Sequence, residues 1–144
     1  MADTDTKMVH WSFWLIGGFA LLWNVGGSVN FFVQMDAEMI ASFRESEQAI
    51  INVRPLWATA GFGLAVFAGA LGGLMLLLKK STAVHLFTAS LVGTAITMIH
   101  TVQVAMGPVN FSTGEIFAMI ILPLLVAAFL LWFAKQMQNR GWVS

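Results

Sequence analysis

Residues 56–78 read LWATAGFGLAVFAGALGGLMLLL, an apolar stretch without one charged side chain. About 20 such residues in an α-helix, rising about 1.5 Å each, cross the hydrocarbon core of a bilayer. The stretch therefore predicts a transmembrane helix. Three similar runs occupy residues 11–33, 83–105 and 116–134, and none contains Asp, Glu, Lys or Arg. The sequence predicts an all-α fold, a bundle of four transmembrane helices that forms a single membrane domain over residues 1–144.

The composition also indicates a membrane protein. Hydrophobic residues make up 58% of the chain and charged residues only 10%, against about 45–50% and about 25% in soluble domains. The lipid bilayer is therefore the expected partner. The net charge of zero argues against nucleic-acid binding, which needs clustered Lys and Arg. The absence of cysteine excludes disulfides, thiolate metal sites and Cys nucleophiles.

The basic residues are distributed unevenly between the two sides of the predicted bundle. On the side of the two termini and the second loop lie Lys7, Lys79, Lys80, Lys135 and Arg140. Only Arg44 and Arg54 lie on the other side. Because short loops rich in Lys and Arg stay in the cytoplasm, both termini are predicted to be cytoplasmic.

The first external loop carries an amphipathic pattern over residues 36–52. Apolar residues recur at helix-like intervals, with charged residues between them, which predicts a short amphipathic helix on the outer membrane surface. A partly helical linker with no further role is the alternative.

Small residues form a stripe on the second span. They recur at every fourth position, at Gly61, Ala65, Gly69 and Gly73, and let another helix backbone approach closely. The stripe predicts a helix-packing face, used either within the bundle or by a partner. In the fourth span, Pro123 predicts a kink, because proline removes one backbone hydrogen bond.

Polar residues gather in the outer halves of the first and third spans. Ser90, Thr94, Thr97 and Thr101 form a stripe on one face of the third span. With polar residues of the first span, this face predicts an outward-facing polar pocket between the two spans. The candidate ligand-binding residues are Asn24, Asn30, Thr97, His100, Gln103 and Glu115.

His100 is the only ionisable side chain well inside a span. Such residues normally face the bundle interior or a watery cavity and often serve a function, and Glu115 is the candidate partner. The alternative is a structural imidazole, hydrogen-bonded to a threonine or a backbone carbonyl of another helix.

No cofactor, metal site or catalytic group is predicted. His10 and His85 both lie near the cytoplasmic face, but two interfacial histidines are weak evidence for a haem. No HxxxH, ExxH or paired-carboxylate pattern lies within the spans. The sequence favours a non-enzymatic role without excluding an enzymatic one.

Several short segments carry a resemblance to a known group. They are LWNVGG at 22–27, RPLW at 54–57, GALGG at 69–73 and SLVG at 90–93. Through them the first three spans resemble small, largely uncharacterised four-helix bacterial inner-membrane proteins, often labelled sugar transporters and placed loosely near the DoxX-like proteins. The resemblance fades in the fourth span. It implies a multi-pass protein of the bacterial cytoplasmic membrane.

Two functions therefore stand side by side. The first is a small transporter or ligand-binding module, expected to be a homo-oligomer, with the outward-facing polar pocket. The second is a non-catalytic accessory subunit that packs through the stripe at residues 61–73 onto a larger membrane complex. The first requires a gap between the polar faces of spans one and three, whereas the second allows them to close together.

Overall fold

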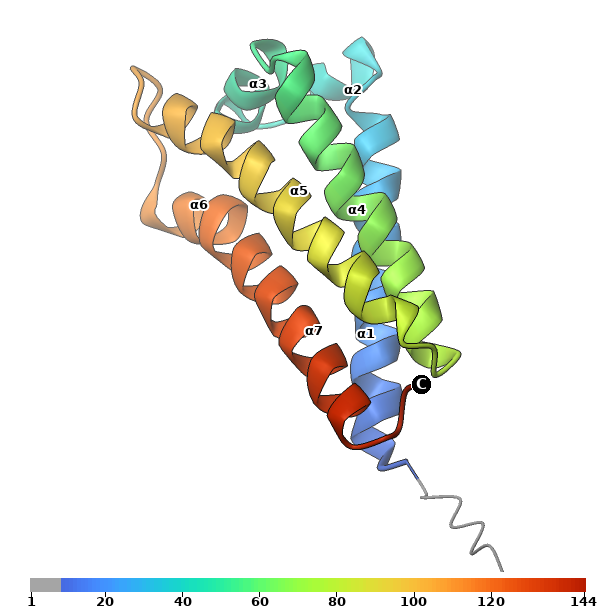
Figure 1. Cartoon of the computed structure of the whole chain (residues 1–144). Helices are drawn as coiled ribbons and strands as arrows, with labels where there is room; N and C mark the ends of the chain where they lie inside the picture. Colours follow the sequence, from blue (N-terminus) through green and yellow to red (C-terminus); the bar gives the residue numbers. More distant parts are fainter. Residues whose placement is uncertain (1–8) are drawn as a thin grey trace, which may run out of the picture.

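Four long apolar helices dominate the computed structural model, which describes residues 9–144 (Figure 1). They are α1 (Trp11–Val33), α4 (Leu56–Leu77), α5 (Thr82–Ala105) and a continuous segment at Thr113–Asn139. Each is long and apolar enough to cross a membrane. The predicted all-α bundle of four spans is therefore confirmed, with the second span ending and the third beginning one residue earlier than predicted.

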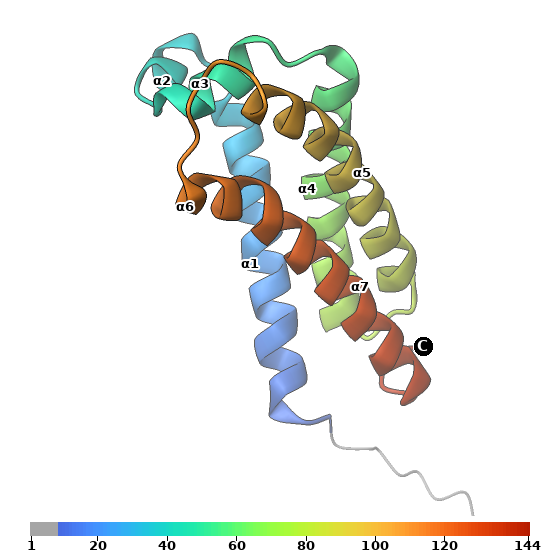
Figure 2. The ribbon, with the colours of Figure 1, turned by 90° about the vertical axis from the view of Figure 1, so that its left-hand side faces the viewer.

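The long helices pack in a simple order. Helix α4 lies between α1 and α5, and α5 in turn packs against α7 (Leu122–Asn139), as Figures 1 and 2 show. The turn from α4 to α5 is tight, and Lys79 takes a left-handed conformation there (φ 58°). Helix α1 packs against α4 along its length and does not pack side by side with α5.

The segment between the first two spans differs from the prediction. Instead of one amphipathic helix over residues 36–52 it forms two, α2 (Ala37–Ala41) and α3 (Glu45–Asn52). Asp36 caps the first helix by accepting hydrogen bonds from two backbone N–H groups. The carboxylate of Glu47 accepts a hydrogen bond from the backbone N–H of Arg44 at 3.1 Å, which starts a second helix in mid-segment. A local cap therefore divides this segment into two helices, although its sequence pattern predicts one.

The fourth span is longer and less regular than predicted. It begins with α6 (Thr113–Ile116), continues through a π-helical turn, η1 (Phe117–Ile121), and ends as α7. Pro123 lies two residues after the end of this turn. A proline ring has no N–H to donate and collides with the carbonyl four residues earlier, and a π-turn relieves both problems. The distortion predicted at Pro123 thus takes the form of a π-turn.

The small-residue stripe of α4 is buried inside the bundle. A Cβ added at Gly61 would lie 2.8 Å from Ile96 on α5, and one added at Gly73 would lie 2.9 Å from the backbone of Leu21 on α1. One stripe thus serves two neighbours, because its Gly61 end faces α5 and its Gly73 end faces α1. It is a packing face within this chain.

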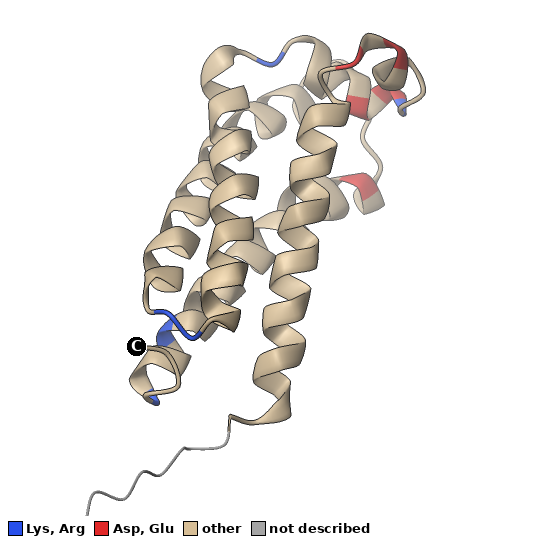
Figure 3. Cartoon of the chain, turned by 90° about the vertical axis from the view of Figure 1, so that its right-hand side faces the viewer, with Lys and Arg blue, Asp and Glu red and all other residues tan. Residues whose placement is uncertain are grey.

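Charge separates the two ends of the bundle (Figure 3). Every Asp and Glu in residues 9–144 lies toward the end with α2, α3 and α6, hereafter the acidic end: Asp36, Glu38, Glu45, Glu47 and Glu115. The opposite end, hereafter the basic end, carries Lys79, Lys80, Lys135 and Arg140. The two remaining described cations, Arg44 and Arg54, lie at the acidic end.

A hydrophobic core closes the basic end. Phe13 of α1, Phe87 of α5 and Phe133 of α7 are buried together there. The C-terminal residues join this core, since Val143 is buried and Ser144 exchanges backbone hydrogen bonds with the α4–α5 turn. The side chains of α1 and α7 meet at this end, whereas toward the acidic end the two helices diverge (Figure 1).

Candidate functional site

A cavity of about 520 Å³ lies in the acidic half of the bundle. Its walls come from α1, α4, α5, η1 and α7, and α3 covers it at the acidic end. The volume falls within the range of about 300–1,000 Å³ that is usual for small-molecule sites. The gap predicted between the polar faces of the first and third spans is therefore present.

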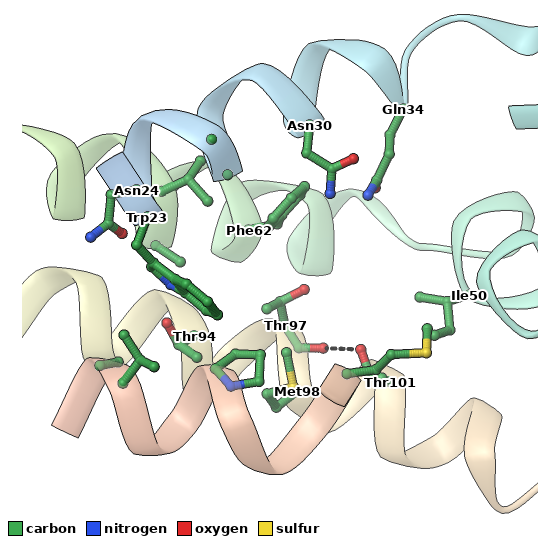
Figure 4. A pocket seen from close by; sticks show the side chains of 18 of the residues that line it. Trp23, Asn24, Asn30, Gln34, Ile50, Phe62, Thr94, Thr97, Met98 and Thr101 are labelled. Atoms are coloured by element: carbon green, nitrogen blue, oxygen red, sulfur yellow. Dashed lines mark hydrogen bonds between the residues drawn. The ribbon is translucent and has the colours of Figure 1, made fainter. Parts of the chain in front are cut away.

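One face of α1 supplies the first wall. Trp23, Gly26, Asn30 and Gln34 line the cavity, and their spacing of three or four residues places them on one side of a helix. In Figure 4 the indole of Trp23 lies across the cavity, while Asn30 and Gln34 lie nearer to α3. Since the glycine carries no side chain, the cavity reaches the backbone of α1 between them.

The hydroxyl stripe of α5 supplies the opposite wall. Ser90 donates a hydrogen bond to the carbonyl of Ala65 at 2.6 Å, and Thr94 and Thr101 donate to carbonyls of their own helix at 2.8 and 3.2 Å. Thr97 differs, because its hydroxyl makes no hydrogen bond within the described residues. No fully buried polar side-chain atom there lacks a partner, so the Thr97 hydroxyl is open to the cavity.

Arg54 forms the polar rim of the cavity at the acidic end. Its Nη1 donates to Oε1 of Gln34 at 2.7 Å, its Nε donates to Oγ1 of Thr59 at 3.3 Å, and its guanidinium lies 5.2 Å above the Phe62 ring. Burial lowers the pKa of Arg54. Within residues 9–144 no carboxylate comes within ion-pair distance of this cation, so its charge is not neutralised by the protein there.

The wall contributed by η1 and α7 is apolar. Met119, Pro123, Val126 and Leu130 line it. Segment η1 packs against α5 and its own neighbours, while α1 packs against α4, so α1 and η1 form no helix-packing interface. Trp23, which lies on this side, is 37% exposed. The cavity therefore borders the lipid-facing surface between α1 and η1.

The six residues predicted to bind ligand divide into two groups. Asn24, Asn30 and Thr97 line the cavity. His100, Gln103 and Glu115 do not, although all three lie in the same half of the bundle. Gln103 is exposed on the bundle surface, and Glu115 accepts hydrogen bonds from Ser46 at 2.6 Å and from the backbone N–H of Ser112 at 2.9 Å.

His100 lies behind the cavity wall. Its side chain is buried, its Nε2 is 3.0 Å from the carbonyl oxygen of Ile50, and its ring is edge-on to Trp57. The predicted partner Glu115 is engaged elsewhere. Three residues along a helix correspond to a rotation of about 60° away from Thr97, which is enough to turn His100 from the cavity toward α3. This geometry matches the alternative stated above, a structural imidazole bonded to a backbone carbonyl of another helix.

Several cavity residues are not among the six candidates. Gln34 and Arg54 were expected at the outer side of the membrane, where they could converge on the pocket, but they were not included in the six, although Gln34 follows Asn30 by four residues and so shares its face. The apolar wall from Met119 to Leu130 carries no sequence signal, because apolar residues look alike whether they face lipid, a core or a cavity.

Two contacts hold α3 over the cavity. Besides the bond between His100 and Ile50, the Ser46 hydroxyl donates to Glu115. Removing the imidazole with His100→Ala is expected to cost about 1 kcal/mol of α3 docking and to speed amide hydrogen exchange in α3 roughly fivefold. Gln103→Ala, an exposed control on the same helix, should leave that exchange unchanged. Equal exchange in both variants would refute the anchoring role.

The other histidines and the comparisons add no further site. His10 caps α1 through the backbone N–H of Ser12 and His85 is exposed. In the part of the chain that the structure describes, no three His, Asp or Glu side chains gather as metal ligands. Comparison with protein-family models, curated proteins and solved structures found no match. The functional argument therefore rests on the cavity.

Proposed function

We propose that this protein is a small membrane transporter or ligand-binding module whose polar pocket between α1 and α5 faces outward. The cavity of about 520 Å³ carries the proposal. Bundles that need only packing close such spaces, because every atom beside a void loses van der Waals contacts. A cavity of this size, with the hydroxyl of Thr97 and the carboxamide of Asn30 at its walls, fits a small-molecule site.

The charge distribution supports the outward orientation. Four described cations lie at the basic end and two at the acidic end, and the positive-inside rule favours the basic end in the cytoplasm. The cavity then lies in the outer half of the membrane. The resemblance of the first three spans to bacterial inner-membrane proteins labelled sugar transporters agrees with this location, and Trp23 offers a stacking surface next to Asn30.

The accessory-subunit alternative loses the observation that suggested it. The stripe from Gly61 to Gly73 is occupied by α1 and α5 of the same chain. A buried face is not free to bind a partner. Attachment to a larger complex would need one of the lipid-facing surfaces instead, for example the exposed side chains of Leu15, Leu22 and Val29 on α1.

Filling the cavity tests the proposal. Gly26 lines the cavity and an added Cβ meets nothing within 4 Å, so Gly26→Leu should occupy the ligand space without disturbing the fold. Gly18→Leu is the matched control, because an added Cβ there is equally free but Gly18 does not line the cavity. Both variants gain the same helix propensity.

Thermal melting of the protein in lipid nanodiscs, against sugars, amphiphiles and quinones, measures the effect. A ligand of the cavity, added at about 100 times its Kd, should raise the Tm of the wild type and of Gly18→Leu by about 5 °C or more and leave Gly26→Leu unchanged. If every stabilising compound acts equally on all three proteins, ligands bind elsewhere and the cavity is not the functional site.

A further inference from the structure

The polar groups of the cavity are distributed unevenly. At the acidic end lie Asn30, Gln34 and Arg54, whereas Trp23 and Leu130 lie deeper in the bundle. The polar residues of the deeper part, Asn24, Ser90 and Thr94, already donate their side-chain hydrogen bonds to backbone carbonyls. Gln34 and Trp23 are separated by about 16 Å along α1, from the helical rise of about 1.5 Å per residue. A ligand that matches both ends has a polar head and a hydrocarbon tail.

Arg54 determines the charge expected of the head. The Nη2 group of this half-buried guanidinium donates no hydrogen bond within the described residues, and no carboxylate there lies within ion-pair distance. An unpaired cation near a bilayer is costly, and a phosphate or carboxylate offsets that cost through paired, charge-assisted hydrogen bonds. The open carboxamide of Asn30 adds a further donor.

Glu47 also lines the cavity, but it already has a cation. Its carboxylate accepts hydrogen bonds from the side chain of Arg44 at 3.4 Å and from the Arg44 backbone at 3.1 Å. The proximity of Glu47 also raises the pKa of Arg44. This pair is neutral as a whole, so Arg54 remains the uncompensated charge of the cavity.

The surroundings favour access from the membrane. Toward water, α3 covers the cavity, and carboxylates such as those of Asp36, Glu38 and Glu45 repel free anions at that surface. Toward lipid, α1 and η1 form no packing interface and Trp23 is partly exposed. An amphiphile can enter sideways there while its tail stays in hydrocarbon.

We infer that the cavity binds an anionic amphiphile, a molecule with a phosphate or carboxylate head and a hydrocarbon tail, which enters from the outer leaflet between α1 and η1. This inference rests on the proposed function and specifies its ligand. The head binds Arg54 and Asn30, and the tail lies along Trp23, Val126 and Leu130.

Three probes separate the parts of the ligand. Dodecyl phosphate carries head and tail, dodecyl maltoside has the same tail with a neutral sugar head, and inorganic phosphate has the anion without the tail. Binding of each is measured as the Tm rise of full-length protein in phosphatidylcholine nanodiscs. The variants are Arg54→Gln, Arg54→Lys and the matched control Arg140→Gln, which removes one exposed arginine at the basic end, away from the cavity.

Dodecyl phosphate is expected to bind the wild type about 10-fold or more tightly than Arg54→Gln, because a charge-assisted hydrogen bond is lost. Arg140→Gln should keep the wild-type affinity, and Arg54→Lys should keep most of it. The other two probes should bind the wild type at least about 10-fold more weakly. Melting without ligand shows that each variant is folded.

Three results would overturn the inference. If Arg54→Gln and Arg140→Gln bind dodecyl phosphate with equal affinity, Arg54 does not bind the head group. If inorganic phosphate binds as tightly as dodecyl phosphate, the ligand needs no hydrocarbon tail, and the argument for sideways access fails. If dodecyl maltoside binds tightly and Arg54→Gln does not change that binding, the ligand head is not anionic. The proposed function survives that result if Gly26→Leu blocks the binding of dodecyl maltoside. Only insensitivity of every probe to Gly26→Leu refutes both.

Discussion

Gly93→Val is expected to lower the free energy of unfolding by about 3 kcal/mol or more. A Cβ added at Gly93 would lie 2.6 Å from the backbone nitrogen of Ala65 and 2.6 Å from the carbonyl oxygen of Gly61. Both atoms belong to the backbone of α4, which cannot move aside as a flexible side chain can. The variant must therefore push α4 and α5 apart at this contact. These two helices are the most extensively packed pair of the bundle.

Denaturation of the protein in mixed micelles with increasing sodium dodecyl sulfate measures this loss. Gly18→Val is the control, because an added Cβ at Gly18 meets nothing within 4 Å. Both variants carry the same β-branched side chain in a helix, so the difference between them isolates the packing at the α4–α5 crossing. A similar stability for the two would show that α4 and α5 do not approach as closely as described.

Phe13→Ala is expected to cost about 3 kcal/mol, the second largest effect. Phe13 is fully buried, and its ring lies 6.2 Å from that of Phe133 and 6.3 Å from that of Trp142. These contacts join α1 to the C-terminal part of the chain at the basic end. Truncating the ring leaves a void that the surrounding helices fill only in part.

Phe19→Ala is the matched control for this prediction. Phe19 lies on the same helix, but 45% of its surface is exposed, so its truncation should cost well under about 1 kcal/mol. The same denaturation experiment compares the two. If Phe19→Ala destabilises the protein as much as Phe13→Ala, the basic-end core does not hold α1 in place.

These predictions follow from a difference in packing between the two ends of the bundle. At the basic end, aromatic side chains fill the space between α1, α5 and α7. Toward the acidic end α1 and η1 form no packing interface, and the cavity opens there under α3. Because the glycines of α4 bring α1 and α5 close to it, the space appears on the side of the bundle that α4 does not occupy. A rigid closed end can thus support an open, ligand-sized half.

The polar residues of the cavity were only partly predictable. The spacing of Thr94 and Thr97 at i+4 and i+7 from Ser90 was visible in the sequence, and so was the placement of Asn30 in the same half of the membrane. His100 satisfied the same criteria but lies behind the wall, bonded to Ile50. Two positions three residues apart on a helix, such as Thr97 and His100, differ by a rotation of about 60°. Which of the two faces the cavity depends on which helices lie beside α5.

Local chemistry allowed the sequence by itself to determine four spans, their approximate ends and the separation of basic from acidic ends. The length and apolarity of a segment are enough to place it in a bilayer. The tertiary structure alone decided that the stripe from Gly61 to Gly73 faces two helices of its own chain, that α7 supplies the apolar wall, and that Arg54 meets Gln34 at the rim. Those facts depend on contacts between segments far apart in the chain, and the periodicity of a single helix does not name its neighbours.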